Sequence, residues 1–234
     1  MTWVHATHVL AQEKRAVNST SLKNAEPRWP ALVALLGAGA LYAALPPSLV
    51  VGGPRWLLPA LVLMLLVPTE ISHHRSQHQL NQMLGYILNS VVTLAMIGSL
   101  ALLIEALPEH TVSPRELLRS AAALWVTNII IFASWYWRLD GGGPHERAQT
   151  PGHSDGAFLF PQMTMDPSAK LAAGEHEWGP NFVDYLFLAF NTSTALSPTD
   201  VPVLSRWAKV LMMTQAMISL LVIVLLAARV VNIL

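Results

Sequence analysis

Long apolar runs separated by short polar connectors dominate this sequence. An α-helix needs about 20 consecutive apolar residues to cross a bilayer. The pattern therefore predicts an all-α, polytopic membrane protein with about five transmembrane helices, and one short re-entrant helix before the last of them. The five predicted spans are residues 29–51, 56–71, 83–107, 114–137 and about 205–234, and the short helix covers 182–193.

The first two apolar runs are short for spanning helices. Pro46 and Pro47 interrupt the first run, and the second has prolines near both ends. A glycine- and proline-containing turn at 52–54 separates them, and Trp29 and Trp56 are typical of residues at a membrane interface. We expect two crossings, with a single helical hairpin as the alternative.

The fourth run has clear start and stop signals. Ser113 precedes Pro114 at the first helical position, and Glu116 follows three residues after the serine, which is the pattern of a capping box. The run ends in the aromatic residues 135–137, so Arg138 is expected to mark the exit from the bilayer.

Changes in composition divide the sequence into four segments. The predicted organisation is a polar N-terminal tail (1–28), a four-helix membrane domain (29–137), an extramembrane loop (138–180) and a C-terminal pore-like module (181–234). The apolar stretch 157–165 inside the extramembrane loop suggests that this loop docks back on the helices.

Composition supports a lipid environment. The 234 residues are 53% hydrophobic and only 12% charged, and the mean hydropathy is +0.44, whereas a soluble domain has roughly 25% charged residues. The formal net charge is zero, so the sequence offers no electrostatic footprint for nucleic acid. It contains no cysteine, which excludes disulfides and thiolate metal sites.

Uncharged polar residues recur at helical spacing within the predicted spans. In a bilayer such side chains point inward and form hydrogen bonds between helices, because lipid offers them no partner. They either join helices or line a polar pathway, and their spacing alone does not separate the two roles. They include Asn89, Thr93, Asn128, Gln215 and Ser219.

The polar segment 70–82 contains a weak candidate metal site. If one helix continues through it, Glu70, His74 and His78 lie one turn apart on a shared face. No further ligand can be named, and a histidine-rich solvated connector is the commoner arrangement, so no metal or other cofactor is assigned. The sequence also has no phosphate-binding loop or paired nucleophile and base, which argues against an enzyme.

The C-terminal module combines a short helix, a polar turn and a long apolar helix. Asn181 is placed to cap the short helix and Asp184 lies in its first turn, with Asn191 and Thr192 toward its end. This helix is long enough to reach only about halfway across a bilayer. The turn that follows, TALSPTD, offers the side-chain oxygens of Thr194, Ser197, Thr199 and Asp200.

This module resembles the pore module of two-helix potassium channels. FNTSTALSPTD followed by SRWAKVLMMTQAMISL also resembles the last segment of bacterial multi-pass membrane proteins of a domain-of-unknown-function class. The resemblance implies a location in the bacterial inner membrane, a homo-oligomer that is a tetramer if it conducts, and monovalent cations as candidate ions. It also implies that Thr194 opens a filter-like turn and Asp200 closes it.

The turn departs from the channel pattern because it contains no glycine. Glycines allow consecutive carbonyl groups to line a filter. The sequence therefore predicts a hydroxyl-lined, weakly selective cation pathway instead of a carbonyl ladder. The alternative is a non-conducting structural or partner-binding membrane protein.

Overall fold

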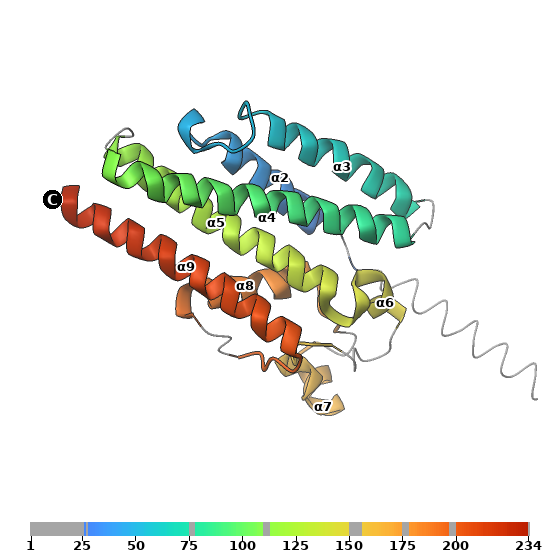
Figure 1. The fold of residues 1–234 in the computed structure, drawn as a ribbon. Helices are drawn as coiled ribbons and strands as arrows, with labels where there is room; N and C mark the ends of the chain where they lie inside the picture. The colour runs from blue at the N-terminus through green and yellow to red at the C-terminus, as the bar shows by residue number, and fades with distance from the viewer. Residues whose placement is uncertain are drawn as a thin grey trace, which may run out of the picture.

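The computed structural model describes residues 26, 28–74, 78–109, 113–149, 156–174, 178–196 and 200–233 (Figure 1). In this part of the chain helices are joined by turns and irregular segments, and β-structure is limited to an isolated bridge between Phe158 and Val203. The helices are α2 (Trp29–Ala43), α3 (Leu57–His74), α4 (His78–Glu109), α5 (Pro114–Leu139), α6 (Pro144–Gln149), α7 (Pro167–Ala172), α8 (Phe182–Ala195) and α9 (Arg206–Ile233), with one-turn 3-10 helices at Pro47–Leu49, Asp140–Gly142 and Pro161–Met163.

Three helical segments are long and apolar enough to cross a membrane. They cover Gln79–Leu107, Pro114–Gly142 and Arg206–Ala228, and have 29, 29 and 23 residues. At 1.5 Å per residue even the shortest spans about 34 Å, which exceeds the roughly 30 Å hydrocarbon core. Trp29–Ala43 and Leu57–Val67 are shorter apolar helical segments.

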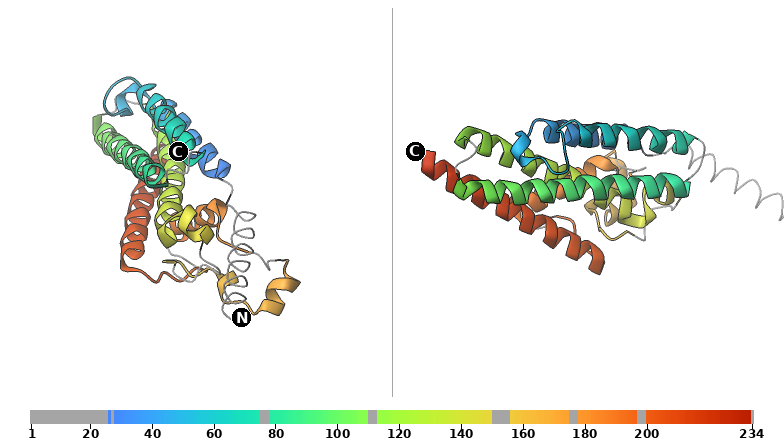
Figure 2. Two further views of the ribbon diagram at one scale, coloured as in Figure 1. Left: turned by 90° about the vertical axis from the view of Figure 1, so that its right-hand side faces the viewer. Right: turned by 45° about the horizontal axis from the view of Figure 1, so that its top comes forward.

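Helix α5 is the centre of the bundle. Helices α2, α4, α8 and α9 all pack against it, and α3 covers α4 and α2 (Figures 1 and 2). Leu117 near the start of α5 lies beside Leu225 of α9, whereas Tyr136 near the end of α5 contacts Gln215. Helix α9 therefore runs antiparallel to α5.

Helices α2 and α3 form a hairpin along α4. The Tyr42 hydroxyl fixes the connection by donating to the Val51 carbonyl oxygen at 3.1 Å and accepting from the Val51 amide at 2.9 Å. The connection lies against α4 at Gly98, where an added Cβ would come within 2.6 Å of Val51 Cγ2. Glycine at this position therefore permits the close approach of the connection to α4.

Both predicted helix caps are confirmed. Ser113 and Glu116 form a capping box at the start of α5. Asn181 and Asp184 form the corresponding box at the start of α8, with the Val183 amide donating to Asn181 Oδ1 at 2.8 Å. Each box satisfies amide groups that a helix N-terminus otherwise leaves without a partner.

The segment between α5 and α8 folds back on the bundle. Phe158 and Phe160 are 1% and 4% exposed. The Phe158 ring packs edge-on against Tyr136 at 5.3 Å and Phe160 packs against Tyr185 at 5.4 Å, both measured between ring centroids. These contacts hold the loop against the last turn of α5 and the first turn of α8.

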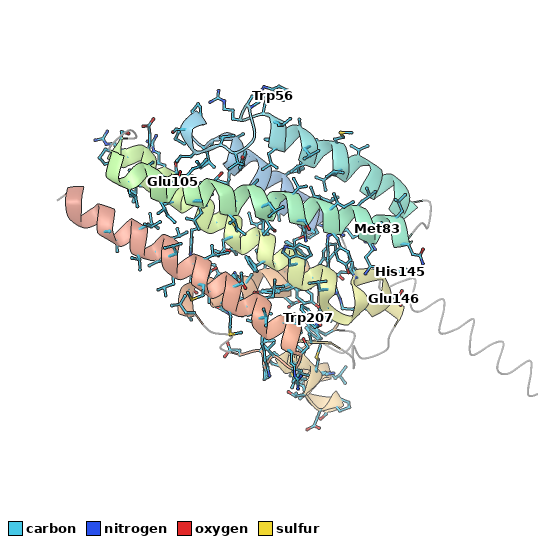
Figure 3. The ribbon with its side chains drawn as sticks, in the orientation of Figure 1. Trp56, Met83, Glu105, His145, Glu146 and Trp207 are labelled. Atoms are coloured by element: carbon cyan, nitrogen blue, oxygen red, sulfur yellow. The ribbon has the colours of Figure 1, made fainter. Side chains whose placement is uncertain are left out.

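The outer surface of the bundle is apolar. Trp56 at the hairpin and Met83 near the start of α4 are 63% and 61% exposed (Figure 3). Met64 of α3, Leu94 of α4 and Met217 of α9 are 71%, 69% and 66% exposed. Large apolar side chains on several helices at once are what a lipid-facing surface requires.

Candidate functional site

Helix α8 reaches into the bundle from one end. Its first residue, Phe182, packs edge-on against Trp137 near the end of α5, with ring centroids 5.8 Å apart. Its 14 residues correspond to about 21 Å of helix. Near its other end, Ser193 lies within hydrogen-bonding distance of Asn128, more than two turns earlier on α5.

After α8 the chain returns to the end at which α8 began. Val203 forms a β-bridge with Phe158, and the Leu204 amide donates to the Ala157 carbonyl oxygen at 2.8 Å. Trp207, in the first turn of α9, packs edge-on against Phe158. Because Phe158 also contacts Tyr136, the start of α8 and the start of α9 lie at the same end of α5.

A buried polar cluster joins α5, α8 and α9. Asn128 Nδ2 donates to Ser219 Oγ at 2.7 Å, and Ser219 Oγ donates to Ser193 Oγ at 2.8 Å. Gln215 Nε2 donates to Ser193 Oγ at 3.0 Å, while Gln215 Oε1 accepts from the Tyr136 hydroxyl at 2.5 Å. All of these residues are fully buried.

The cluster uses most of its hydrogen-bonding capacity within one chain. Asn128 Oδ1 is its one buried side-chain atom without a partner among the described residues. The predicted polar residues Asn128, Gln215 and Ser219 are thus brought together with Ser193, and they connect three helices. The arrangement supports hydrogen bonding between helices, and it contains no carboxylate, amine or imidazole for moving protons.

A second polar group joins α4 to α5. Ser134 Oγ donates to Asn89 Oδ1 at 2.9 Å, and the Trp135 indole nitrogen donates to Thr93 Oγ1 at 3.0 Å. Thr93 Oγ1 in turn donates to the Asn89 carbonyl oxygen at 2.6 Å. The predicted pair Asn89 and Thr93 therefore also lies at a helix contact.

The end of α8 differs from the sequence prediction. Thr194 was expected in the turn, but it belongs to the last turn of α8, where its exposed hydroxyl donates to the Phe190 carbonyl oxygen at 2.9 Å. This bond to the carbonyl four residues earlier keeps the hydroxyl on its own helix, so Thr194 fits in the last helical turn. Leu196 ends it in the left-handed region, with φ of 56°.

The other predicted residues of the module are separated by burial. Thr192 is buried and donates to the Leu188 carbonyl oxygen at 2.8 Å, and Asn191 is half-buried. Asp184 serves in the N-terminal cap. Asp200 is exposed, whereas Ser197 and Thr199 lie outside the described residues.

The condition for the weak metal candidate, one helix through Glu70, His74 and His78, is not met, because α3 and α4 are separate helices that pack against each other. Glu70 and His74 belong to α3, which ends at His74, and His78 begins the separate helix α4. The side chains of all three lie outside the described residues. Among the residues that the structure describes, no group of three or more histidine, aspartate or glutamate side chains is arranged to hold a metal ion.

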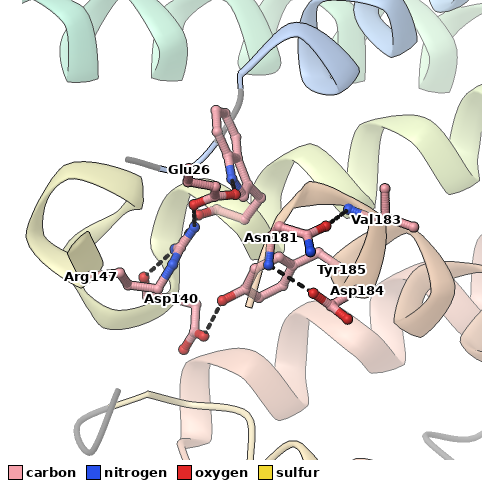
Figure 4. A network of polar contacts seen from close by, with 8 residues as sticks. Glu26, Asp140, Arg147, Asn181, Val183, Asp184 and Tyr185 are labelled. Carbon is pink, nitrogen blue, oxygen red and sulfur yellow. Dashed lines mark hydrogen bonds and ion pairs between the residues drawn. The ribbon is translucent and has the colours of Figure 1, made fainter. Parts of the chain in front are cut away.

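A charged cluster at the end of α5 was not predicted (Figure 4). Glu26 forms an ion pair with Arg147 at 3.0 Å and accepts a hydrogen bond from the Trp137 indole. Arg147 also donates to the Asp140 carbonyl oxygen at 2.7 Å, and the Tyr185 hydroxyl donates to the Asp140 carboxylate at 2.6 Å. The cluster thus joins Glu26, three residues before α2, to the end of α5, to α6 and to α8.

No local signal identifies this cluster, because Glu26 and Arg147 are 121 positions apart in sequence. Burial raises the pKa of the Glu26 carboxyl above its usual range, since the loss of solvation outweighs the opposing attraction of the Arg147 guanidinium. The Arg147 guanidinium also lies over the Tyr185 ring, 4.9 Å from its centroid.

Comparisons with protein-family models, with curated proteins and with solved structures returned no match for this chain.

Proposed function

We propose that this chain is a five-span integral membrane protein of the cell membrane, and that copies of it assemble into a weakly selective cation pore. In this arrangement α2, α3, α4, α5 and α9 cross the bilayer and α8 is re-entrant. The observation that carries the proposal is the return of the chain, after α8, to the end of α5 at which α8 began. Such a path brings the end of a short helix to membrane depth without crossing.

An exposed apolar stripe on α8 supports assembly of several copies. Val183, Phe187 and Phe190 are 56%, 54% and 46% exposed, and the exposed Thr194 follows at the same helical spacing. On the neighbouring helix α9, Met213 and other apolar residues are also exposed. One re-entrant element cannot enclose an axis alone, so identical copies are needed to surround one.

The chemistry at the end of α8 supports weak selectivity. The exposed Thr194 hydroxyl and the exposed Asp200 carboxylate offer oxygen atoms to a cation. The turn between them has no glycine, so a run of consecutive carbonyl groups facing one axis is disfavoured. We therefore propose ion contact through side-chain oxygens, with homotetramers as the assembly.

Flux of monovalent cations into proteoliposomes tests this proposal. Asp200→Asn is expected to lower the flux at least fivefold, and Thr194→Ala is expected to change the ratio of potassium to sodium flux. Asp166→Asn is the control for the exposed carboxylate. Thr214→Ala is the control for the hydroxyl, because Thr214 is also exposed on a helix and donates to a carbonyl oxygen four residues earlier. Folded oligomers without flux would refute the pore.

A non-conducting structural or partner-binding role is the second candidate. It is favoured by the hydrogen bonds that Asn128, Gln215 and Ser219 make within one chain. Side chains that are bonded to one another in this way do not line a pathway for ions. This role predicts a monomer or dimer in detergent and no functional effect of Asp200→Asn.

A further inference from the structure

A cavity of about 40 Å³ lies where the start of α4 meets the end of α5 and the start of α6. On this scale one water molecule needs roughly 10–15 Å³, so the cavity has room for about three water-sized atoms. Because the cavity is partly open, a larger group can place two or three of its oxygen atoms inside while its remainder extends outward. Its wall contains two arginines, two side-chain amides, one histidine and one carboxylate. The lining residues that carry the argument are Arg28, Asn81, Gln82, Arg138, His145 and Glu146.

Arg138 is buried in this wall and forms no ion pair among the described residues. It is 6% exposed, and its Nε atom is buried without a hydrogen-bond partner. Among the described residues, the guanidinium forms no ion pair or hydrogen bond, and it lies over the Trp137 ring, 5.3 Å from the centroid. A buried cation without a partner is costly unless an anion reaches it.

The backbone of α4 is shaped to admit this guanidinium. At Gly85 an added Cβ would lie 1.8 Å from Arg138 Nη1 and 2.2 Å from Cζ. The guanidinium thus occupies the space that a side chain at position 85 would fill. The chain places a second positive group, Arg28, in the same wall, where Arg28 Nη1 donates to Asn81 Oδ1 at 3.3 Å.

We propose that this cavity binds a phosphate group, held by Arg138 and Arg28. Planar guanidinium groups match the oxygen geometry of phosphate and make strong, charge-assisted hydrogen bonds to it. The inference is independent of the pore proposed above, because it concerns the wall between α4, α5 and α6.

The position and charge of the cavity favour the phosphodiester of a lipid headgroup over inorganic phosphate. Trp135 and Trp137 adjoin Arg138 at the end of the predicted span, as expected for residues at headgroup level. The Glu146 carboxylate in the wall penalises each added negative charge. It therefore disfavours a phosphate dianion more than a singly charged diester.

The test uses the delipidated full-length chain in neutral detergent, with the unfolding temperature followed as ligand is added. Phosphatidylglycerol is the lipid probe, diacylglycerol is the control without phosphate, and sodium phosphate against sodium gluconate at equal ionic strength tests the soluble source. A ligand that binds the folded state raises its unfolding temperature in a concentration-dependent way.

Phosphatidylglycerol is expected to raise the unfolding temperature of the wild type, and diacylglycerol is not. Arg138→Gln should increase the half-saturating concentration at least tenfold, and Glu146→Gln should decrease it. Arg115→Gln, at the exposed start of α5, is the matched control and should leave it unchanged. A shift by sodium phosphate alone would assign a soluble phosphate; a shift by lipid alone would assign the headgroup.

Gly85→Ala provides a second variant that keeps every charge. Its methyl group displaces the Arg138 guanidinium, so weaker phosphatidylglycerol binding is expected again. Without ligand, Arg138→Gln should unfold at the same or a higher temperature than the wild type, because it removes a buried charge. Equal phosphatidylglycerol affinities of the wild type, Arg138→Gln and Gly85→Ala would overturn the proposal, as would equal stabilisation by diacylglycerol.

Discussion

The side chains that matter most at the scale of single residues are polar groups placed where water does not reach. In the cluster of α5, α8 and α9, Asn128, Ser193, Gln215 and Ser219 serve as donors and acceptors for one another. Removal of one member leaves its partners buried without compensation. The cost of a substitution therefore depends on the neighbours as well as on the contact that is lost.

Asn128→Ala is expected to lower the free energy of unfolding by about 1–2 kcal/mol. This value combines the loss of hydrogen bonds between helices in a membrane with some loss of packing. Asn191→Ala, the same change at a half-buried position of α8, should cost less. Equilibrium unfolding in detergent measures both values. Equal costs at the two positions would contradict a structural role for the cluster.

Glu26 makes stability depend on pH. Its pKa is raised in the folded protein, so the folded state binds this proton more tightly than the unfolded state. Its contribution to stability is fully present below the unfolded pKa, near 4.5, and is lost as the pH rises through the folded pKa.

Glu26→Gln keeps an acceptor for Trp137 and Arg147 but cannot ionise. The variant should therefore gain stability relative to the wild type as the pH rises from about 4 to 7. Unfolding temperatures of both proteins across this range test the expectation. A growing loss of stability in the variant over the same range would show that the ion pair with Arg147 outweighs burial.

At the scale of elements, the close approach of the α2–α3 connection to α4 depends on a single glycine. Gly98 leaves space for the Val51 side chain. The Tyr42 hydroxyl holds the Val51 backbone in place through hydrogen bonds to its amide and its carbonyl oxygen. A Cβ at position 98 of α4 would meet the Val51 side chain and push the connection away.

Gly98→Ala should destabilise the protein by about 1–3 kcal/mol through overpacking against Val51. Gly37→Ala on α2 is the matched control, since a Cβ there meets nothing within 4 Å. It should stabilise α2 by up to about 1 kcal/mol, because alanine favours helix more than glycine does. Opposite signs for the two changes in thermal unfolding are the expected result.

The elements themselves were largely predictable from sequence, but the contacts between distant segments were not. Capping residues such as Ser113 and Asn181 act on their own helices, so their effect is readable locally. The pairing of Asn128 with Ser219 requires the rotation and register of two helices, which helical spacing leaves open. The ion pair of Glu26 and Arg147 depends on the path of the whole chain.

At the scale of the whole molecule, the apolar faces of α8 and α9 distinguish one side of the bundle. The α8 stripe ends at a hydroxyl, whereas the exposed residues of α2 and α3, such as Val33 and Met64, belong to uniformly apolar stretches. The proposed assembly uses the first side between copies and leaves the second to lipid.

The absence of cysteine allows this assembly to be tested with single introduced thiols. Phe187→Cys on α8 should form cross-links between copies with a short bifunctional reagent, because Phe187 lies on the proposed contact face. Val33→Cys on α2, which is similarly exposed, should not. Cross-linking of Val33→Cys alone would place the contact between copies on α2 instead of α8.

The buried cluster also dictates an order of events during synthesis. Ser193 leaves the ribosome before Gln215 and Ser219, yet these later residues are its partners. Helix α8 packs directly against α5, but the hydrogen bonds of Ser193 to α9 form only after the first half of α9 has been made. A ribosome paused between residues 196 and 215 therefore holds a chain whose first helices are complete while Ser193 still lacks its partners on α9.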